Sequence, residues 1–281
     1  MDIINNTCKK LIKQMDKGAY RFGYVDVFYA FIDYCMHACS YGRIPYTGKD
    51  EEMNALVRDM FQGMSDVIEP FEDALGDLYM EVASKGKQSR MGQFFTPEHI
   101  CMMMAVMAIG EHHDTQKEPK EPCIHEPSSG SGRNILAAES VLRKQGRKGL
   151  YCAIDLDPLC AKMTAINMML NSCKGVVFYG DTLALDLYTA YEIVVPPMCP
   201  PILIKHEDAE RNALKHLFFG HLLDRQVEKQ PVLEPIKPVT LFDMTDSEYV
   251  EERTKREKTN LTKKVVPPKT ISVDDTQLSL F

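Results

Sequence analysis

The residues best placed to do chemistry surround two glycines near the middle of the chain. Glu126 ends a short apolar stretch, and Gly130 and Gly132 precede a helical pattern that ends near Arg143. Glycines let backbone amides approach a ligand closely, and the N-terminus of the following helix carries a partial positive charge. A strand that ends in an acid and turns through glycines into a helix predicts a site for a nucleotide-like cofactor.

A second carboxylate follows the next predicted strand. Residues 150–154 form a short apolar run, and Asp155 comes directly after them. In a doubly wound sheet, a carboxylate at this point accepts hydrogen bonds from ribose hydroxyls. A dinucleotide site would show three spaced glycines, whereas this turn begins with Glu126 and Pro127. The pattern therefore differs from that of a dinucleotide site.

The pattern Glu-Pro-x-x-Gly-x-Gly of residues 126–132 resembles the S-adenosylmethionine turn of N6-adenine DNA methyltransferases, in particular the modification subunit of type I restriction systems. Three further motifs occur in the order found in that family, across roughly residues 70–195. They are Leu75-Gly76-Asp77-Leu78-Tyr79-Met80 with Gly92-Gln93-Phe94-Phe95-Thr96-Pro97, Ala153-Ile154-Asp155-Leu156-Asp157-Pro158, and Gly180-Asp181-Thr182-Leu183.

The resemblance implies S-adenosylmethionine as the cofactor and assigns roles to individual residues. Phe95 and Thr96 line its methionine end, Glu126 and the glycine-turn amides hold the amino-acid and sugar region, Asp155 takes the ribose hydroxyls and Asp181 the adenine amine. The full set is Phe95, Thr96, Glu126, Pro127, Ser128, Gly130, Ser131, Gly132, Asp155 and Asp181. The alternative is that Asp155 and Asp157 are a loop acid and a helix cap, and that Asp181 belongs to an ordinary Gly-Asp turn.

The residues that would activate the target amine are not clearly present. By resemblance, the family uses a polar residue, two prolines and an aromatic residue that stacks on the flipped base. This chain offers Val195-Pro196-Pro197-Met198 or, in a shifted register, Cys199-Pro200-Pro201-Ile202. Loss of a positioned oxygen acceptor costs on the order of 10²-fold in rate, and loss of a stacking ring about 1–3 kcal/mol. We therefore assign no catalytic residue and interpret Val195–Met198 as a degenerate position.

The elements that must position these residues follow from hydrophobic periodicity. Residues 1 to about 85 have helical spacing, and from residue 123 onward strands and helices alternate as in a parallel sheet, with residues 191–195 as a fourth strand. One more helix is expected over residues 206–227. We predict an α/β fold with a Rossmann-like, truncated, S-adenosylmethionine-dependent methyltransferase core and a helical N-terminal domain. The predicted domains are residues 1–90 (helical), 91–228 (core) and 229–281 (a Pro-rich, basic tail).

Composition limits the location and the metal chemistry. The chain has 281 residues and a net charge of −7, with no apolar run near the length of a membrane span, so a cytoplasmic protein without a membrane partner is expected. Nine cysteines show neither a disulfide framework nor paired metal knuckles. Cys35, His37 and Cys39 could be imagined as zinc ligands, but their spacing is poor, so they are interpreted as core residues and no metal is expected.

The end of the chain carries an independent signal. Gln277-Leu278-Ser279-Leu280-Phe281 resembles the pentapeptide by which bacterial proteins bind the replicative sliding clamp. The alternative is a terminal strand or helix that folds back on the core. Residues 253–269 are strongly basic, which suits either contact with DNA phosphates or a solvated linker.

Together these observations predict an S-adenosylmethionine-binding protein of the N6-adenine DNA methyltransferase family that acts on DNA and is recruited to the sliding clamp. Its expected partners are DNA, the clamp and a specificity or partner subunit that selects the target site. One alternative is a catalytically inactive adaptor that uses the methyltransferase fold to bind DNA, a restriction-modification complex or the replication machinery. A third hypothesis is methylation of a substrate other than adenine.

Overall fold

The computed structural model of the chain describes residues 5–85, 94–110, 121–227 and 277–279. Contacts divide the chain into two compact units, residues 1–218 with 275–281 and residues 219–274. The N-terminal helices and the sheet both belong to the first unit. The predicted domain boundaries at residues 90 and 228 stay a prediction.

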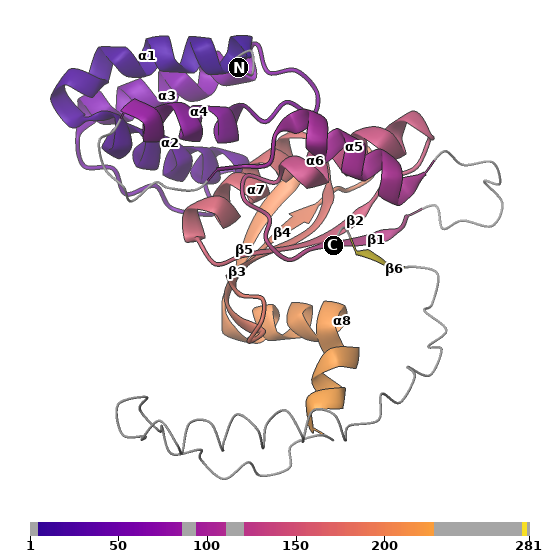
Figure 1. Ribbon diagram of the computed structural model, residues 1–281. Helices are drawn as coiled ribbons and strands as arrows, with labels where there is room; N and C mark the ends of the chain where they lie inside the picture. Colours follow the sequence, from indigo (N-terminus) through magenta and orange to yellow (C-terminus); the bar gives the residue numbers. More distant parts are fainter. Residues whose placement is uncertain (1–4, 86–93, 111–120, 228–276, 280–281) are drawn as a thin grey trace, which may run out of the picture. The chain divides into compact units, whose positions relative to one another are not determined.

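Four helices lie within the described residues 5–85, in agreement with the helical spacing of the sequence (Figure 1). They are α1 (Asn6–Phe22), α2 (Tyr24–Cys39), α3 (Glu51–Ser65) and α4 (Ala74–Lys85). Asn5 caps α1 by accepting a hydrogen bond from the amide of Cys8, and Asp50 caps α3 through the amides of Glu52 and Met53. These helices pack together through fully buried side chains such as Phe28, which meets the ring of Tyr79 edge-on.

A six-stranded sheet has the order β5-β4-β3-β2-β1-β6. The parallel part consists of β1 (Cys123–Glu126), β2 (Leu150–Asp155) and β3 (Lys174–Asp181), joined by the crossover helices α6 (Arg133–Lys144) and α7 (Pro158–Leu170). The helix α5 (Glu98–Ile109) packs against α6. This arrangement confirms the predicted α/β fold with a Rossmann-like core, in which ligands bind at the carboxyl ends of the parallel strands.

The prediction of a fourth parallel strand at residues 191–195 is wrong. The strand β4 (Asp186–Val194) begins earlier and runs antiparallel to β3, so that Asp186 pairs with Asp181 and Ile193 pairs with Gly175. The cause is the short connection, because residues 182–185 form a turn, whereas a parallel crossover needs a dozen or more residues. The next strand, β5 (Ile202–His206), pairs antiparallel with β4.

Two elements complete the described chain. The helix α8 (Asp208–Val227) confirms the helix predicted over residues 206–227, and it crosses the boundary between the two units. The short strand β6 (Gln277–Ser279) pairs in parallel with β1, with Leu278 opposite Ile124. Leu280 and Phe281 lie outside the described residues, as does the basic segment 253–269.

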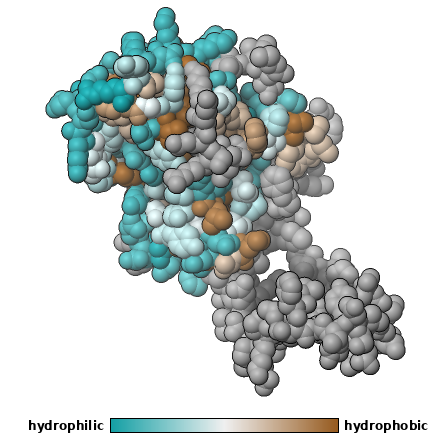
Figure 2. Space-filling view, turned by 60° about the vertical axis from the view of Figure 1, so that its left-hand side comes forward, coloured by the Kyte–Doolittle hydropathy of each residue, from teal (hydrophilic) through white to brown (hydrophobic). Residues whose placement is uncertain are grey.

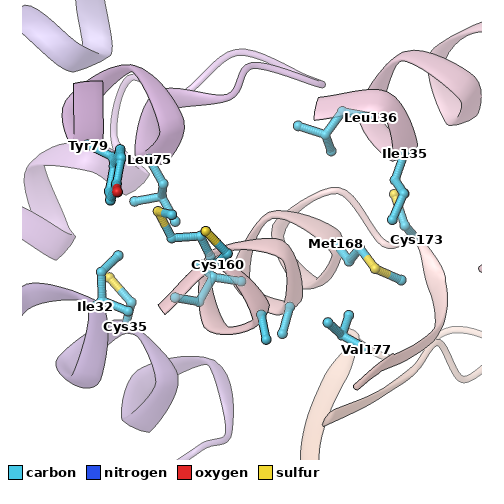
Figure 3. Packing of buried hydrophobic residues seen from close by; sticks show 14 of the residues in the cluster. Ile32, Cys35, Leu75, Tyr79, Ile135, Leu136, Cys160, Met168, Cys173 and Val177 are labelled. Atoms are coloured by element: carbon cyan, nitrogen blue, oxygen red, sulfur yellow. The ribbon is translucent and has the colours of Figure 1, made fainter. Parts of the chain in front are cut away.

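The core is rich in sulfur-containing side chains and continues from the N-terminal helices into the sheet. Figure 3 shows Cys160 of α7 between Leu75 and Tyr79 of α4 on one side and Met168 and Val177 on the other. Seven of the nine cysteines are buried and all nine are free thiols, so Cys35 and Cys39 are core residues as interpreted from the sequence. Burial raises the pKa of Cys39 to about 12.

The surface contrasts with this core. On the face shown in Figure 2, hydrophilic side chains predominate, and apolar ones form small separate patches. Within the described ranges, no helix is both long and apolar enough to cross a membrane.

Candidate cofactor site

A cleft of about 1030 Å³ opens at the carboxyl ends of β1, β2 and β3. Its walls come from the glycine turn after β1, the turn after β2, the turn after β3 and the segment that precedes α5. Eight of the ten cofactor residues predicted from the sequence line it, whereas Glu126 and Gly132 do not. The eight are Phe95, Thr96, Pro127, Ser128, Gly130, Ser131, Asp155 and Asp181.

The glycine turn requires both of its glycines. Gly130 and Gly132 have φ values of 56° and 90°, which lie in the left-handed region that residues with a Cβ rarely adopt. A Cβ on Gly132 would lie 3.2 Å from the backbone of Thr164 in α7, and one on Gly130 would lie 2.9 Å from the ring of Phe95. The glycines thus allow α6, α7 and the aromatic ring to approach one another closely.

Asp155 ties the end of β2 to this turn. One of its carboxylate oxygens accepts a hydrogen bond from the amide of Gly130 at 2.7 Å, and the other accepts one from the amide of Asp157 at 2.9 Å. Asp157 in turn caps α7 by accepting the amide of Leu159, so the cap interpretation holds for Asp157. Burial raises the pKa of Asp155 above its usual value, while the two amides oppose that rise. Each carboxylate oxygen keeps lone pairs for hydroxyl donors, because a carboxylate accepts about four hydrogen bonds.

Asp181 ends β3 and shapes the next turn. Its carboxylate accepts the amides of Leu183 at 2.8 Å and Ala184 at 3.0 Å, and the hydroxyl of Thr182 donates to the carbonyl of Pro127 at 2.5 Å. Asp181 therefore belongs to an Asx-type turn, as the alternative proposed, and it also faces the cleft. Both statements hold together because the carboxylate has more acceptor sites than the turn uses.

Glu126 lies behind the wall of the cleft. Its side chain is 1% exposed and accepts hydrogen bonds from Asn134 Nδ2 at 3.0 Å and from the amide of Ser128 at 3.4 Å. Burial raises the pKa of Glu126 to about 7, although those two donors oppose the rise. Asn134, in the first turn of α6, is the group that lines the cleft at this point. The sequence analysis missed Asn134, although a polar residue one turn into the helix after the glycine turn was an available signal.

A buried polar network holds the glycine turn in place on the side of the N-terminal helices. The sequence analysis also missed this network. The carboxylate of Asp73, 6% exposed, accepts four hydrogen bonds from different elements. The donors are the hydroxyl of Ser131 at 2.5 Å, Arg133 Nε at 2.8 Å, Asn167 Nδ2 at 2.7 Å and the amide of Gly76 at 2.9 Å. One carboxylate thus joins α4, the glycine turn, α6 and α7.

Arg133 extends this network toward the segment before α5. Its guanidinium donates to Asp77 at 2.6 Å and to the carbonyl of Thr96 at 3.3 Å, and its side chain is 8% exposed. Desolvation raises the pKa of Asp77 to about 6, even though the Arg133 cation lowers it. The sequence analysis assigned no physical role to the motif Leu75–Met80. The structure shows one, because Asp77 holds Arg133 against Thr96 and the amide of Gly76 holds Asp73 against Ser131.

Aromatic and aliphatic side chains surround the mouth of the cleft. Phe95 packs against Tyr79, with ring centroids 5.1 Å apart, and against the glycine turn. Phe94, Leu156 and Leu183 also line the cleft, but they are 92%, 65% and 95% exposed. Gly92 and Gln93 of the same motif lie outside the described residues.

The two Pro-Pro runs lie at the other end of the sheet. Because β4 runs antiparallel to β3, the chain leaves β4 beside the start of β3 rather than beside Asp181. Val195, Pro196, Pro197 and Met198 follow there, and the carbonyl of Pro201 accepts a hydrogen bond from the hydroxyl of Tyr41 in the N-terminal region. None of these residues lines the cleft.

The arrangement is suited to binding an adenosine-containing ligand with a charged amino-acid end. Carboxylates at Asp155 and Asp181 can accept from hydroxyl and amine donors, and Oδ1 of Asn134 is buried without a hydrogen-bond partner among the described residues. Cys101 is the one thiol among the described lining residues, and burial raises its pKa to about 11, so it is not a nucleophile at neutral pH. Of the parts described, the cleft therefore offers binding groups rather than a covalent catalyst.

Comparisons with known proteins agree with this geometry. A family model described as N-6 DNA Methylase matches residues 71–211, which are 141 of the 281 residues of the chain. A search of curated proteins found no match.

Two solved structures are similar at 16% sequence identity. One, a putative class I S-adenosylmethionine-dependent methyltransferase from Listeria monocytogenes, has a TM-score of 0.45, with 64% of this chain and 55% of that chain covered. The other, a type I restriction-modification system methyltransferase subunit from Streptococcus thermophilus, has a TM-score of 0.34, with 63% and 39% covered. This chain thus spans about half of the length of these proteins or less.

Proposed function

Because the chain belongs to the N-6 DNA methylase family, whose cofactor is S-adenosylmethionine, we propose that it binds this cofactor in the cleft and acts on adenine in DNA. The observation that carries the proposal is the convergence of the glycine turn, Asp155 and Asp181 on one cleft. The same three features were assigned to the cofactor from the sequence. When bound, S-adenosylmethionine supplies an activated methyl group.

Different residues of the cleft bind different parts of the cofactor in this proposal. Asp155 accepts the ribose hydroxyls, Asp181 accepts the adenine amine, and Phe95 with Thr96 lines the methionine end. Fixed acceptors orient a flexible ligand, which is the main contribution that such a site makes to methyl transfer.

We propose that a partner subunit completes the substrate side. In doubly wound sheets, three strands lie on one side of the ligand crevice and further parallel strands lie beyond the first strand. Here that side of β1 holds only the three residues of β6 among the described residues. Since the Pro-Pro runs are at the opposite end of the sheet, we propose that the acceptors for a target amine and the selection of a DNA site belong to that subunit.

The position of the Pro-Pro runs also favours the second candidate function. A protein that binds S-adenosylmethionine without acceptors for the target amine would act as an adaptor on DNA, in a restriction-modification complex or at the replication machinery. Transfer of labelled methyl groups to adenine-containing DNA separates the two candidates, because only the methyltransferase incorporates label, alone or with its partner subunit.

Recruitment to the sliding clamp is the role we propose for Gln277–Phe281, and it places the protein in the cytoplasm with the replicating DNA. The backbone of Gln277–Ser279 pairs with β1, so the segment must leave this edge before it can bind a clamp in extended form. The alternative from the sequence, a terminal strand folded on the core, describes the same segment in its docked state.

Calorimetric titration of the purified chain with S-adenosylmethionine tests the cofactor proposal. We expect binding in the micromolar range that the variant Asp155→Ala lowers by at least tenfold, because the ribose loses its acceptor and the turn loses its tie to β2. Circular dichroism of the variant controls for folding. Absence of binding by the folded wild-type protein would refute the methyltransferase proposal.

A further inference from the structure

The outward side of α1 carries a row of lysines. This helix, at the top of Figure 1, packs against α2, α3 and α4 through the side that holds Cys8, Leu11 and Met15, which are at most 1% exposed. Residues three or four positions apart share one face of a helix, so the basic residues of α1 gather on the opposite side. The lysine face of α1 consists of Lys9, Lys10, Lys13 and Lys17.

Acids of the same helix do not balance this charge. α1 has five basic residues and one acid, in a chain whose net charge is −7. The acid, Asp16, accepts a hydrogen bond from the hydroxyl of Tyr24 at 2.6 Å, and the fifth base, Arg21, lies beside Asp50 and Glu52. Within the described part of the chain, the four lysines form no ion pair.

The spacing of the lysines is unfavourable for the helix alone. Lys9, Lys13 and Lys17 follow one another at intervals of four residues, and like charges at this spacing repel. A surface of negative charge relieves that repulsion. One turn beyond Lys17, Tyr20 is fully exposed, and a phenol hydroxyl in this position can donate to a phosphate oxygen.

The shape of this face indicates the kind of anionic partner. A helix rises about 1.5 Å per residue, so Lys9 and Lys17 are about 12 Å apart along the axis. Duplex DNA carries about one negative charge per 1.7 Å of its axis, so a contact of this length meets several phosphates. A membrane-binding helix would have to insert its apolar side among the lipids, but the apolar side of α1 is buried against the other helices.

We infer that the lysine face of α1 binds the phosphate backbone of double-stranded DNA without reading its sequence. This inference rests on the proposed action on DNA, which it deepens by naming a surface that holds the duplex. Phosphate contacts fix the position and orientation of a duplex and leave base recognition to other groups.

The start of α1 is joined to the cofactor site by hydrogen bonds. Asn5 Nδ2 donates to Asp77 at 2.8 Å, and Asp77 accepts from Arg133 at 2.6 Å. Arg133 also donates to the carbonyl of Thr96, which lines the cleft. DNA held on α1 is therefore held by the same packed unit that contains the cleft.

The salt dependence of DNA binding tests this inference. Each lysine that neutralises a phosphate contributes about −0.9 to the slope of log affinity against log salt concentration. In fluorescence anisotropy with a labelled duplex of about 20 base pairs, Lys13→Gln/Lys17→Gln is expected to make the slope shallower by about 2 and to weaken binding about tenfold at about 0.1 M salt. Lys9 is left unchanged because it shares a pocket with Glu69 and Glu72.

The matched control is Lys144→Gln/Lys148→Gln, which removes two exposed lysines at and after the end of α6 and changes the net charge equally. It should leave the slope within about 0.5 of the wild-type value. Tyr20→Phe should weaken binding about threefold without changing the slope, because a neutral hydroxyl releases no counterion. Thermal unfolding followed by circular dichroism shows whether each variant is folded.

An unchanged slope in folded Lys13→Gln/Lys17→Gln would overturn the inference and would assign any DNA binding to another surface, such as the basic segment 253–269. An equal change of slope in the control would also overturn it, since net charge alone would then explain the loss. If the α1 variant instead loses binding to phosphatidylserine vesicles and keeps its affinity for DNA, the lysines serve a membrane and the inference is wrong.

Calorimetry with S-adenosylmethionine keeps this inference separate from the proposed function. Both double variants should keep the wild-type affinity for the cofactor, because none of the four substituted lysines lines the cleft. If the cofactor binds and the slope is unchanged in the α1 variant, only the DNA surface is wrong. If the folded wild-type protein binds no cofactor, the proposed function is wrong, whereas the slopes still report on α1.

Discussion

At the scale of single residues, two acids that look equivalent in the sequence have different surroundings. Asp155 and Glu126 each end a parallel strand, and each was assigned to the cofactor. Asp155 reaches the cleft and is held by two backbone amides, whereas Glu126 is buried behind Asn134. The buried acid therefore carries the larger electrostatic cost, and its removal should be visible in the stability of the fold.

The pH dependence of unfolding measures that cost. A native pKa of about 7 for Glu126, against 4.5 as its ordinary value, means that the folded chain binds more protons than the unfolded chain between these values. Stability from this group is present below about pH 4.5 and is lost as pH rises through 7, by about 3 kcal/mol in total. Glu126→Gln should remove this decline in urea denaturation between pH 5 and 8.

The matched control is Glu51→Gln, which changes an exposed carboxylate in α3. It should leave the wild-type decline in place. Equal slopes for the wild-type protein and Glu126→Gln would contradict the raised pKa of Glu126.

At the scale of elements, the cofactor turn depends on a carboxylate from outside the parallel sheet. Asp73 precedes α4, yet it binds Ser131, Arg133 and Asn167, which belong to the glycine turn, α6 and α7. Arg133 is almost fully buried and relies on Asp73 and Asp77 for its counter-charge. The N-terminal helices are therefore part of the cofactor site in energetic terms.

The variant Asp73→Asn tests this dependence. It keeps the shape of the side chain but removes half of the counter-charge of a buried guanidinium, which should lower the free energy of unfolding by about 3 kcal/mol in urea denaturation. The matched control is Arg21→Ala, which removes exposed pairs with Asp50 and Glu52 and should cost less than about 1 kcal/mol. Similar losses for the two variants would show that the Asp73 network is no stronger than a surface ion pair.

At the scale of the whole molecule, the sheet is built outward from β3 on one side and is closed by β6 on the other. The hairpin of β3 and β4 carries the chain away from β1, and the edge of β1 pairs with Gln277–Ser279. The same terminal segment is the proposed clamp ligand. Binding to the clamp and pairing with β1 therefore exclude each other.

Deletion of residues 277–281 tests the division between the cleft and the terminal segment. We expect the shortened chain to bind S-adenosylmethionine within about twofold of the full chain, because the described residues Gln277–Ser279 pair with the backbone of Cys123–His125, before β1 reaches the glycine turn. Its binding to an immobilised bacterial sliding clamp, measured by surface plasmon resonance, should be lost. Undiminished clamp binding would refute the proposed role of the pentapeptide.

The sequence by itself determined the cofactor side of this protein. A strand that ends in an acid, a turn with two glycines and a capped helix are encoded within a few neighbouring residues, so the glycine turn, Asp155 and α7 could be predicted from local pattern. The helical N-terminal region followed from periodicity for the same reason.

Only the tertiary structure decided the rest, because it depends on contacts between residues distant in sequence. Asp73 meets Ser131 across 58 positions, which no local pattern reveals. The antiparallel direction of β4 comes from its pairing with β3, and this pairing moves Val195–Met198 away from the cleft. The burial of Glu126 behind Asn134 is likewise decided by packing. Either side chain could line the cleft as far as the sequence shows, and only the fold places Asn134 at the cleft and Glu126 behind it.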